Sequence, residues 1–279
     1  MTDSISRLKL AYMVATPDIE SREALGYHGD INYSTKLLRE LGYDGIELTT
    51  ADPDAFGWGA VQAAIEAAGL DVPLVCSGEV FGQSKLGLAA PDEHVRAAAL
   101  VRLKRLVDFA AIFGSNVNIG RSRWYYTEGV PRSLTEQWAY EAFCEIADYA
   151  AEKSVCIALE PIAFHVCNFI NSTQEGLEWV RRVGRPNFKL MLDVYHMNID
   201  DRLSIESSIF QAVQADAVVH VHLCDTNRKP PGYGHMDFPS IFDALKRAGY
   251  TGYVSAEVFN YPDQDEAIVR CAEVFKQLL

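Results

Sequence analysis

The sequence predicts a single-domain (β/α)8 barrel that covers residues 1–279. Short apolar runs alternate with helix-like segments from one end of the chain to the other, and there are eight of each. The apolar runs are continuous, which indicates strands that are buried on both faces and paired in parallel. No glycine-rich dinucleotide fingerprint follows the first run, so a closed barrel is favoured over an open, doubly wound sheet. A chain of 279 residues suits one such barrel.

The first half of the chain contains four predicted strands. They are expected at residues 8–14, 43–48, 72–76 and 116–119. Helices are expected between them at residues 32–41, 61–68 and 93–113. The last of these is the clearest, because apolar residues recur at spacings of three and four between an N-cap at Asp92 and a stop at Gly114. Gly42 and Gly69 end the two earlier helices in the same way.

The second half repeats the pattern after a long irregular segment. Residues 120–133 carry three arginines and three aromatic residues, and we expect a lid or an interface loop there. Strands are expected at residues 155–159, 189–192, 218–221 and 254–256. Helices are expected at residues 139–150, 174–183, 205–213 and 239–247, and a last helix runs to the C-terminus. The segment 228–238, with two prolines and two glycines, is a second candidate for a functional loop.

Composition restricts the function classes. The net charge of −13 argues against a nucleic-acid partner, which requires a basic surface, and favours a small or neutral ligand. No apolar stretch reaches the roughly 18 residues of a membrane span, and the N-terminus lacks the apolar core of a signal peptide. The six cysteines form no C-x-x-C pair, which favours reduced core thiols in a cytoplasmic protein.

An acidic or imidazole side chain closes each of the last four predicted strands. These residues are Glu160, Asp193, His222 and Glu257. Catalytic residues of an α/β barrel lie at the C-terminal ends of its strands, so we expect the four side chains to converge. Three carboxylates and one imidazole suit Mn²⁺, Mg²⁺, Co²⁺ or Zn²⁺. Each residue alone could equally cap a helix or pair with an arginine.

Further polar residues follow these strand ends. His196, Arg228 and His165 are candidates for contact with substrate oxygens, although each could be an ordinary loop residue. Glu47 ends the second strand and could support the site or pair with a basic neighbour. His220 should face inward one layer below His222, where a hydrogen-bonded core histidine is the simpler interpretation.

At these residues the chain resembles the xylose-isomerase-like TIM-barrel superfamily, and within it the sugar isomerases and epimerases related to D-tagatose 3-epimerase and hydroxypyruvate isomerase. The motifs that carry the resemblance are residues 42–47, 160–161, 192–198, 220–222, 225–228 and 256–257. The resemblance implies one divalent metal, with Mn²⁺ expected first and Co²⁺, Mg²⁺ or Zn²⁺ as alternatives. It implies that Glu160, Asp193, His222 and Glu257 bind this metal. It also implies that Glu160 and Glu257 exchange protons with substrate carbon, and that His196 and Arg228 hold substrate oxygens.

The function predicted from this resemblance is that of a metal-dependent keto-sugar isomerase or epimerase. It would remove a proton α to a carbonyl and form a metal-stabilised enediolate. The chain departs from the ketose 3-epimerases at Val166, which stands where they usually carry a second glutamate. This keeps open a β-eliminating lyase of the same superfamily, such as an inosose-type dehydratase or a C-glycoside deglycosidase subunit acting on a 3-keto sugar.

Two other classes are compatible with such a barrel: a DNA-repair endonuclease, which requires more metal ligands and basic loops, and a non-catalytic sugar-binding protein. We expect a carbohydrate substrate, no nucleic acid and no membrane, and a homo-oligomer or a partner subunit stays open.

Overall fold

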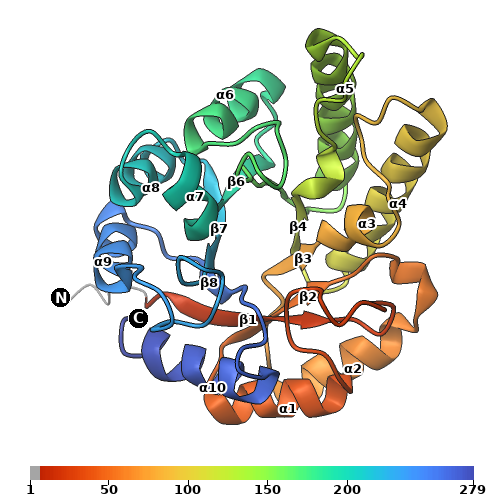
Figure 1. Cartoon of the computed structure of the whole chain (residues 1–279). Coiled ribbons are helices and arrows are strands. Elements are labelled where there is room, and N and C mark those ends of the chain that lie inside the picture. The colour runs from red at the N-terminus through yellow and green to blue at the C-terminus, as the bar shows by residue number, and fades with distance from the viewer. Residues whose placement is uncertain (1–6) are drawn as a thin grey trace.

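Eight parallel strands close into a barrel in chain order, as the sequence predicts (Figure 1). The computed structural model describes residues 7–279. The strands are β1 (Lys9–Ala15), β2 (Gly45–Thr49), β3 (Leu74–Cys76), β4 (Asn116–Ile119), β5 (Ile157–Leu159), β6 (Phe188–Asp193), β7 (Val218–Leu223) and β8 (Tyr253–Ala256). The barrel closes because β1 pairs with β8 as well as with β2. The protein is therefore a (β/α)8 barrel.

A ring of helices surrounds the strands (Figure 1). The helices are α1 (Ile31–Leu41), α2 (Trp58–Ala68), α3 (Gly78–Gly82), α4 (Glu93–Ala111), α5 (Arg132–Ala151), α6 (Thr173–Val183), α7 (Val194–Asp200), α8 (Ile205–Gln214), α9 (Phe238–Ala248) and α10 (Gln264–Phe275), with 3-10 turns η1 (Pro53–Ala55) and η2 (Arg121–Arg123). Asp92 caps α4 by accepting a hydrogen bond from the backbone N–H of His94, and Gly42 ends α1 in the left-handed conformation. The sequence predicts both boundaries.

Two short helices, α3 and α7, depart from the predicted pattern. Helix α7 begins directly after Asp193, where we expected a loop that led to the helix at 205–213. The Asp193 carboxylate accepts a hydrogen bond at 2.8 Å from the backbone N–H of Tyr195, so the same side chain ends a strand and caps a helix. Helix α3 has five residues, too few to show the helical periodicity on which our prediction relied.

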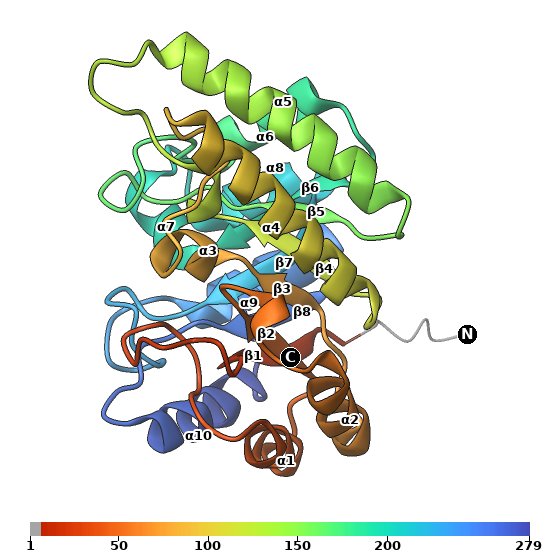
Figure 2. The same cartoon turned by 90° about the vertical axis from the view of Figure 1, so that its right-hand side faces the viewer.

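The parallel register brings the strand ends to one side of the barrel. In β6 and β7, Asp193 pairs with His222, and in β1 and β2, Met13 pairs with Glu47. Figure 2 shows the loops that contain α3 and α7 at the same end of the barrel, opposite the N-terminus. The candidate residues therefore lie around one opening, at the end where active sites occur in this fold.

The strands and helices enclose a large apolar core of the described residues. All six cysteines are free thiols, and Cys76, Cys167, Cys224 and Cys271 are buried, as predicted from their apolar surroundings. Within residues 7–279, no helix has both the length and the apolar character needed to cross a bilayer.

Candidate metal centre and active site

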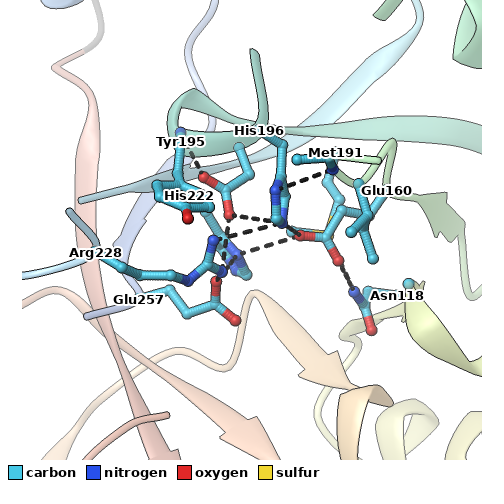
Figure 3. A network of polar contacts seen from close by, with 12 residues as sticks. Asn118, Glu160, Met191, Tyr195, His196, His222, Arg228 and Glu257 are labelled. Carbon is cyan, nitrogen blue, oxygen red and sulfur yellow. Dashed lines mark hydrogen bonds and ion pairs between the residues drawn. The ribbon is translucent and has the colours of Figure 1, made fainter. Parts of the chain in front are cut away.

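The four strand-end residues converge on one point. Each of Glu160, Asp193, His222 and Glu257 offers a ligand atom, and these atoms all lie within 4.8 Å of one another. The side chains come from the ends of β5, β6, β7 and β8, and all four are buried. Figure 3 shows Glu160, His222 and Glu257 pointing toward one another from different strands. The arrangement brings three carboxylates and one imidazole together at buried positions at one end of the barrel.

The donor atoms of this cluster fit a divalent cation. His222 Nδ1 lies 3.3 Å from Glu257 Oε2 and 4.0 Å from Glu160 Oε1. His222 Nδ1 and Asp193 Oδ2 are buried and make no hydrogen bond of good geometry within the described part of the chain, and their nearest charged neighbours are Glu257 Oε2 and Arg228 Nη2. Buried polar atoms are normally satisfied, so two such atoms that face the same group of carboxylates suit a bound cation.

Burial and charge move the pKa values of the two glutamates in opposite directions. Burial raises the pKa of Glu160 to about 8, and the neighbouring Glu257 and Asp193 add to this shift. Burial acts in the same direction on Glu257, but the positive charges of Arg228 and His222 outweigh it and lower the pKa of this carboxyl. The two glutamates therefore differ in protonation before any ligand binds.

A second buried group lies behind His222. Its Nε2 is 2.9 Å from both carboxylate oxygens of Glu47, and His220 Nε2 lies 3.0 Å from Glu47 Oε2. All three side chains are fully buried. Glu47 therefore pairs with basic neighbours, and His220 is a hydrogen-bonded core histidine. Because Nε2 of His222 faces Glu47, its Nδ1 faces Glu160 and Glu257.

His196 lies at the edge of the cluster on α7. Its Nδ1 accepts a hydrogen bond at 3.2 Å from the backbone N–H of Ala163, and its Nε2 lies 3.6 Å from Asp193 Oδ2 and 3.9 Å from Glu160 Oε1. Burial lowers its pKa well below the ordinary value, and the charge of Arg228 lowers it further. A neutral ring that accepts at Nδ1 carries its proton on Nε2, so His196 presents a donor to the cluster.

Arg228 lies beside His196, with its Nη1 atom 3.4 Å from His196 Nε2, and contacts the carboxylates. Its Nη2 atom contacts Glu257 Oε2 and lies 3.0 Å from Asp193 Oδ2. The guanidinium stacks on the ring of Tyr195, 4.8 Å from its centre. Tyr195 Oη lies 3.4 Å from His165 Nε2, which extends this row of side chains toward the surface.

A cavity of about 760 Å³ opens above the cluster, within the usual size range of small-molecule sites. Its lining includes Glu160, Glu257, His196, Arg228, His165 and Val166. Arg121 of the predicted lid segment lines the cavity too. Asn168, three residues after His165, is not part of this lining and instead bonds Tyr126 in the loop between β4 and α5.

Two polar residues near the cluster were not identified from the sequence. Asn118 is fully buried on β4 and donates a hydrogen bond at 2.9 Å to Glu160 Oε2. Tyr195 lines the cavity beside Arg228. A buried amide side chain near the end of a barrel strand is a signal that could have pointed to Asn118. Tyr195 carries no comparable signal, because α7 itself was not predicted.

Comparison with known proteins gives a consistent family. The family model described as xylose isomerase-like TIM barrel matches residues 35–278. A ketose 3-epimerase of Arthrobacter globiformis is 29% identical over 236 residues, which are 82% of this chain and 78% of the relative. A D-psicose 3-epimerase of Ruminiclostridium cellulolyticum is 30% identical over 243 residues, which are 84% of this chain and 80% of the relative. A crystal structure of a D-allulose 3-epimerase from Methylomonas sp. in complex with D-allulose has a TM-score of 0.80 at 23% identity and covers 98% of both chains.

Proposed function

Because this chain belongs to the xylose isomerase-like TIM barrel family, we propose that it is a divalent-metal-dependent keto-sugar epimerase that transfers protons at the carbon next to a carbonyl. The observation that carries this proposal is the convergence of Glu160, Asp193, His222 and Glu257 within 4.8 Å beneath one cavity. The sequence relatives described above are named as sugar epimerases. They do not favour the eliminating lyase, which the sequence had kept open as an alternative.

The proposed metal ligands are Glu160, Asp193, His222 and Glu257. Three carboxylates and one imidazole are compatible with Mn²⁺, which we propose as the resident ion, and also with Co²⁺, Mg²⁺ or Zn²⁺. When bound, such an ion would act as a Lewis acid toward the carbonyl and hydroxyl oxygens of the sugar. It would also replace the proton of His222, whose pKa is raised because the carboxylates of Glu47 and Glu257 outweigh the effect of burial.

Glu160 and Glu257 are the proposed proton-transfer pair. One carboxylate removes the proton next to the carbonyl, and the other returns a proton to the opposite face of the same carbon, which inverts its configuration. Both side chains line the cavity, from the ends of β5 and β8, which supports their action on one substrate carbon from two sides. His196, Arg228 and His165 would hold substrate oxygens, since all three line the cavity and carry hydrogen-bond donors.

The proposed substrate is an unphosphorylated keto-sugar. A Methylomonas relative was crystallised with D-allulose, and no glycine-rich phosphate motif follows the last two strands of this chain. The acidic balance of the sequence disfavours the DNA-repair alternative.

Deuterium exchange tests the proposed reaction directly. Enzyme stripped with a chelator and reloaded with Mn²⁺ should incorporate solvent deuterium at carbon 3 of D-fructose or D-psicose, as measured by NMR. Glu257→Gln should lower this exchange by about 10²–10⁴-fold, because a general base is lost. Glu273→Gln, a change at an exposed glutamate of α10, is the matched control and should exchange like the wild type. Full exchange in Glu257→Gln, or in the stripped enzyme, would contradict the proposal, and loss of a β-substituent would restore the lyase.

A further inference from the structure

A series of buried hydrogen bonds leads to Glu160 from the side of the barrel formed by β3 and β4. Asn118 Nδ2 donates to Glu160 Oε2 at 2.9 Å, and Asn118 Oδ1 accepts at 2.7 Å from the backbone N–H of Ser77. The Ser77 hydroxyl lies 3.2 Å from the same Oδ1 and 2.7 Å from the hydroxyl of Ser122. Asn118, Ser77 and Ser122 are all fully buried. None of these three residues is a proposed metal ligand.

The direction of the Asn118 bond is set by the backbone. A backbone N–H can only donate, so the amide oxygen of Asn118 must face Ser77. The amide nitrogen is thereby turned toward Glu160, whose Oε2 must accept. The other oxygen of Glu160, Oε1, is the one near His196 and His222. Oε2 of Glu160 is therefore bonded to the fixed amide of Asn118, and Oε1 is left facing the proposed metal ligands.

Gly120 leaves open the space in which the Glu160 carboxylate lies. A Cβ atom at Gly120 would lie 2.6 Å from Glu160 Oε2 and 3.2 Å from Asn118 Nδ2. Real Cβ atoms do not approach other atoms so closely, so any side chain at 120 would displace Glu160 or its amide partner. Gly120 and Asn118 therefore both determine the position of Glu160 Oε2.

Resting on the proposed function, we infer that Asn118 is the positioning residue of Glu160 and that Gly120 provides the room for this orientation. Glu257 has no equivalent amide partner among the described residues and instead contacts Arg228 and His222. A change at Asn118 should therefore impair one of the two proton-transfer groups and leave the other in place. The effect of the change should therefore differ between the two epimers of a substrate, because a different glutamate removes the proton from each.

The test compares exchange with inversion in D₂O, starting from each epimer separately. When Glu257 removes the proton, a misplaced Glu160 cannot protonate the opposite face, and Glu257 returns deuterium to the original face. The ratio of exchange to inversion should then rise about tenfold or more in Asn118→Asp, in the range that loss of a supporting hydrogen bond produces. When Glu160 must remove the proton, exchange and inversion should fall together. A general loss of folded protein would change both rates equally from both epimers.

Asn116→Asp is the matched control, because Asn116 lies on the same strand and bonds the carbonyl of Pro73 away from the cluster. It should keep the wild-type ratio from both epimers. If Asn118→Asp does not fold, Asn118→Ala and Gly120→Ala displace the same carboxylate and should raise the ratio from the same epimer. An unchanged ratio in these variants would overturn the inference while the proposed function stands. Absence of exchange in the Mn²⁺-loaded wild type would overturn both.

Discussion

His222 shows how a single side chain joins two buried polar groups. Its Nε2 lies 2.9 Å from the carboxylate of Glu47, and its Nδ1 faces Glu160 and Glu257. The charges of His222 and His220 lower the pKa of Glu47 to about 2, although burial opposes this shift. An ionised Glu47 keeps the Nε2 proton in place and leaves the Nδ1 lone pair for a cation. Glu47 thus controls the ring of a proposed ligand without touching the proposed metal position.

Glu47→Gln should weaken metal binding by about 10–100-fold, because a neutral amide holds the His222 ring less firmly and in less certain orientation. Isothermal titration of the stripped protein with Mn²⁺ measures the change. Glu66→Gln, at an exposed position of α2, should bind Mn²⁺ like the wild type. Equal affinities in Glu47→Gln and the wild type would show that the Glu47 contact does not orient a ligand.

At the scale of elements, Arg123 connects the loop after β4 with the loop after β5 through hydrogen bonds. It is fully buried and makes five hydrogen bonds, which all end on backbone carbonyls: those of Gly120, Glu160, Phe169 and Ile170. Ile170 has a φ of 60°, a conformation that a β-branched residue rarely adopts. Its carbonyl accepts from both Arg123 and the backbone N–H of Ile162. One arginine therefore secures the segment that carries Glu160.

Arg123→Met should lower the free energy of unfolding by about 3 kcal/mol or more, because several buried carbonyls lose their donors at once. Urea unfolding followed by circular dichroism measures this loss. The control is Arg202→Met, at an exposed arginine, which should change the stability by less than about 0.5 kcal/mol. A stability loss no larger than that of the control would mean that the two loops hold their positions without Arg123.

At the scale of the whole molecule, the barrel could be predicted because eight continuous apolar runs alternate with helical segments. The fold then placed four strand-end side chains together, which is why the proposed ligands could be chosen from the sequence. Asn118 could not, because its importance depends on a neighbour 42 residues away that only the closed barrel brings near. Helix α7 was missed for a related reason: Asp193 serves as its N-cap, and seven residues are too few for a clear helical period.

Metal-free protein should lose stability as the pH rises from 6.5 to 8. The folded-state pKa of Glu160 is raised to about 8, and that of His222 is also raised, so both groups lose protons more readily after unfolding in this interval. The lowered pKa values of His196 and His220 act only below their ordinary value of about 6.5, where they have the opposite effect. The free energy of unfolding should fall by about 2 kcal/mol across the interval.

Urea unfolding at both pH values, with chelator and with Mn²⁺, measures this dependence. Bound metal should remove most of it, because the ligands are then already deprotonated. Glu160→Gln should also flatten the dependence in chelator, since the variant has no proton to lose at that position. A metal-free stability that rises between pH 6.5 and 8 would contradict the assigned shifts.

The proposed ligands follow one another along the chain in the order of their strands, from Glu160 after β5 to Glu257 after β8. A growing polypeptide on the ribosome therefore lacks the complete set until β8 has been synthesised. Earlier fragments would offer one, two or three donors on strands whose barrel has not yet closed. A cation at the proposed site would accordingly be loaded only after β8 has been made, and its identity would depend on the pool of metal that the finished barrel meets.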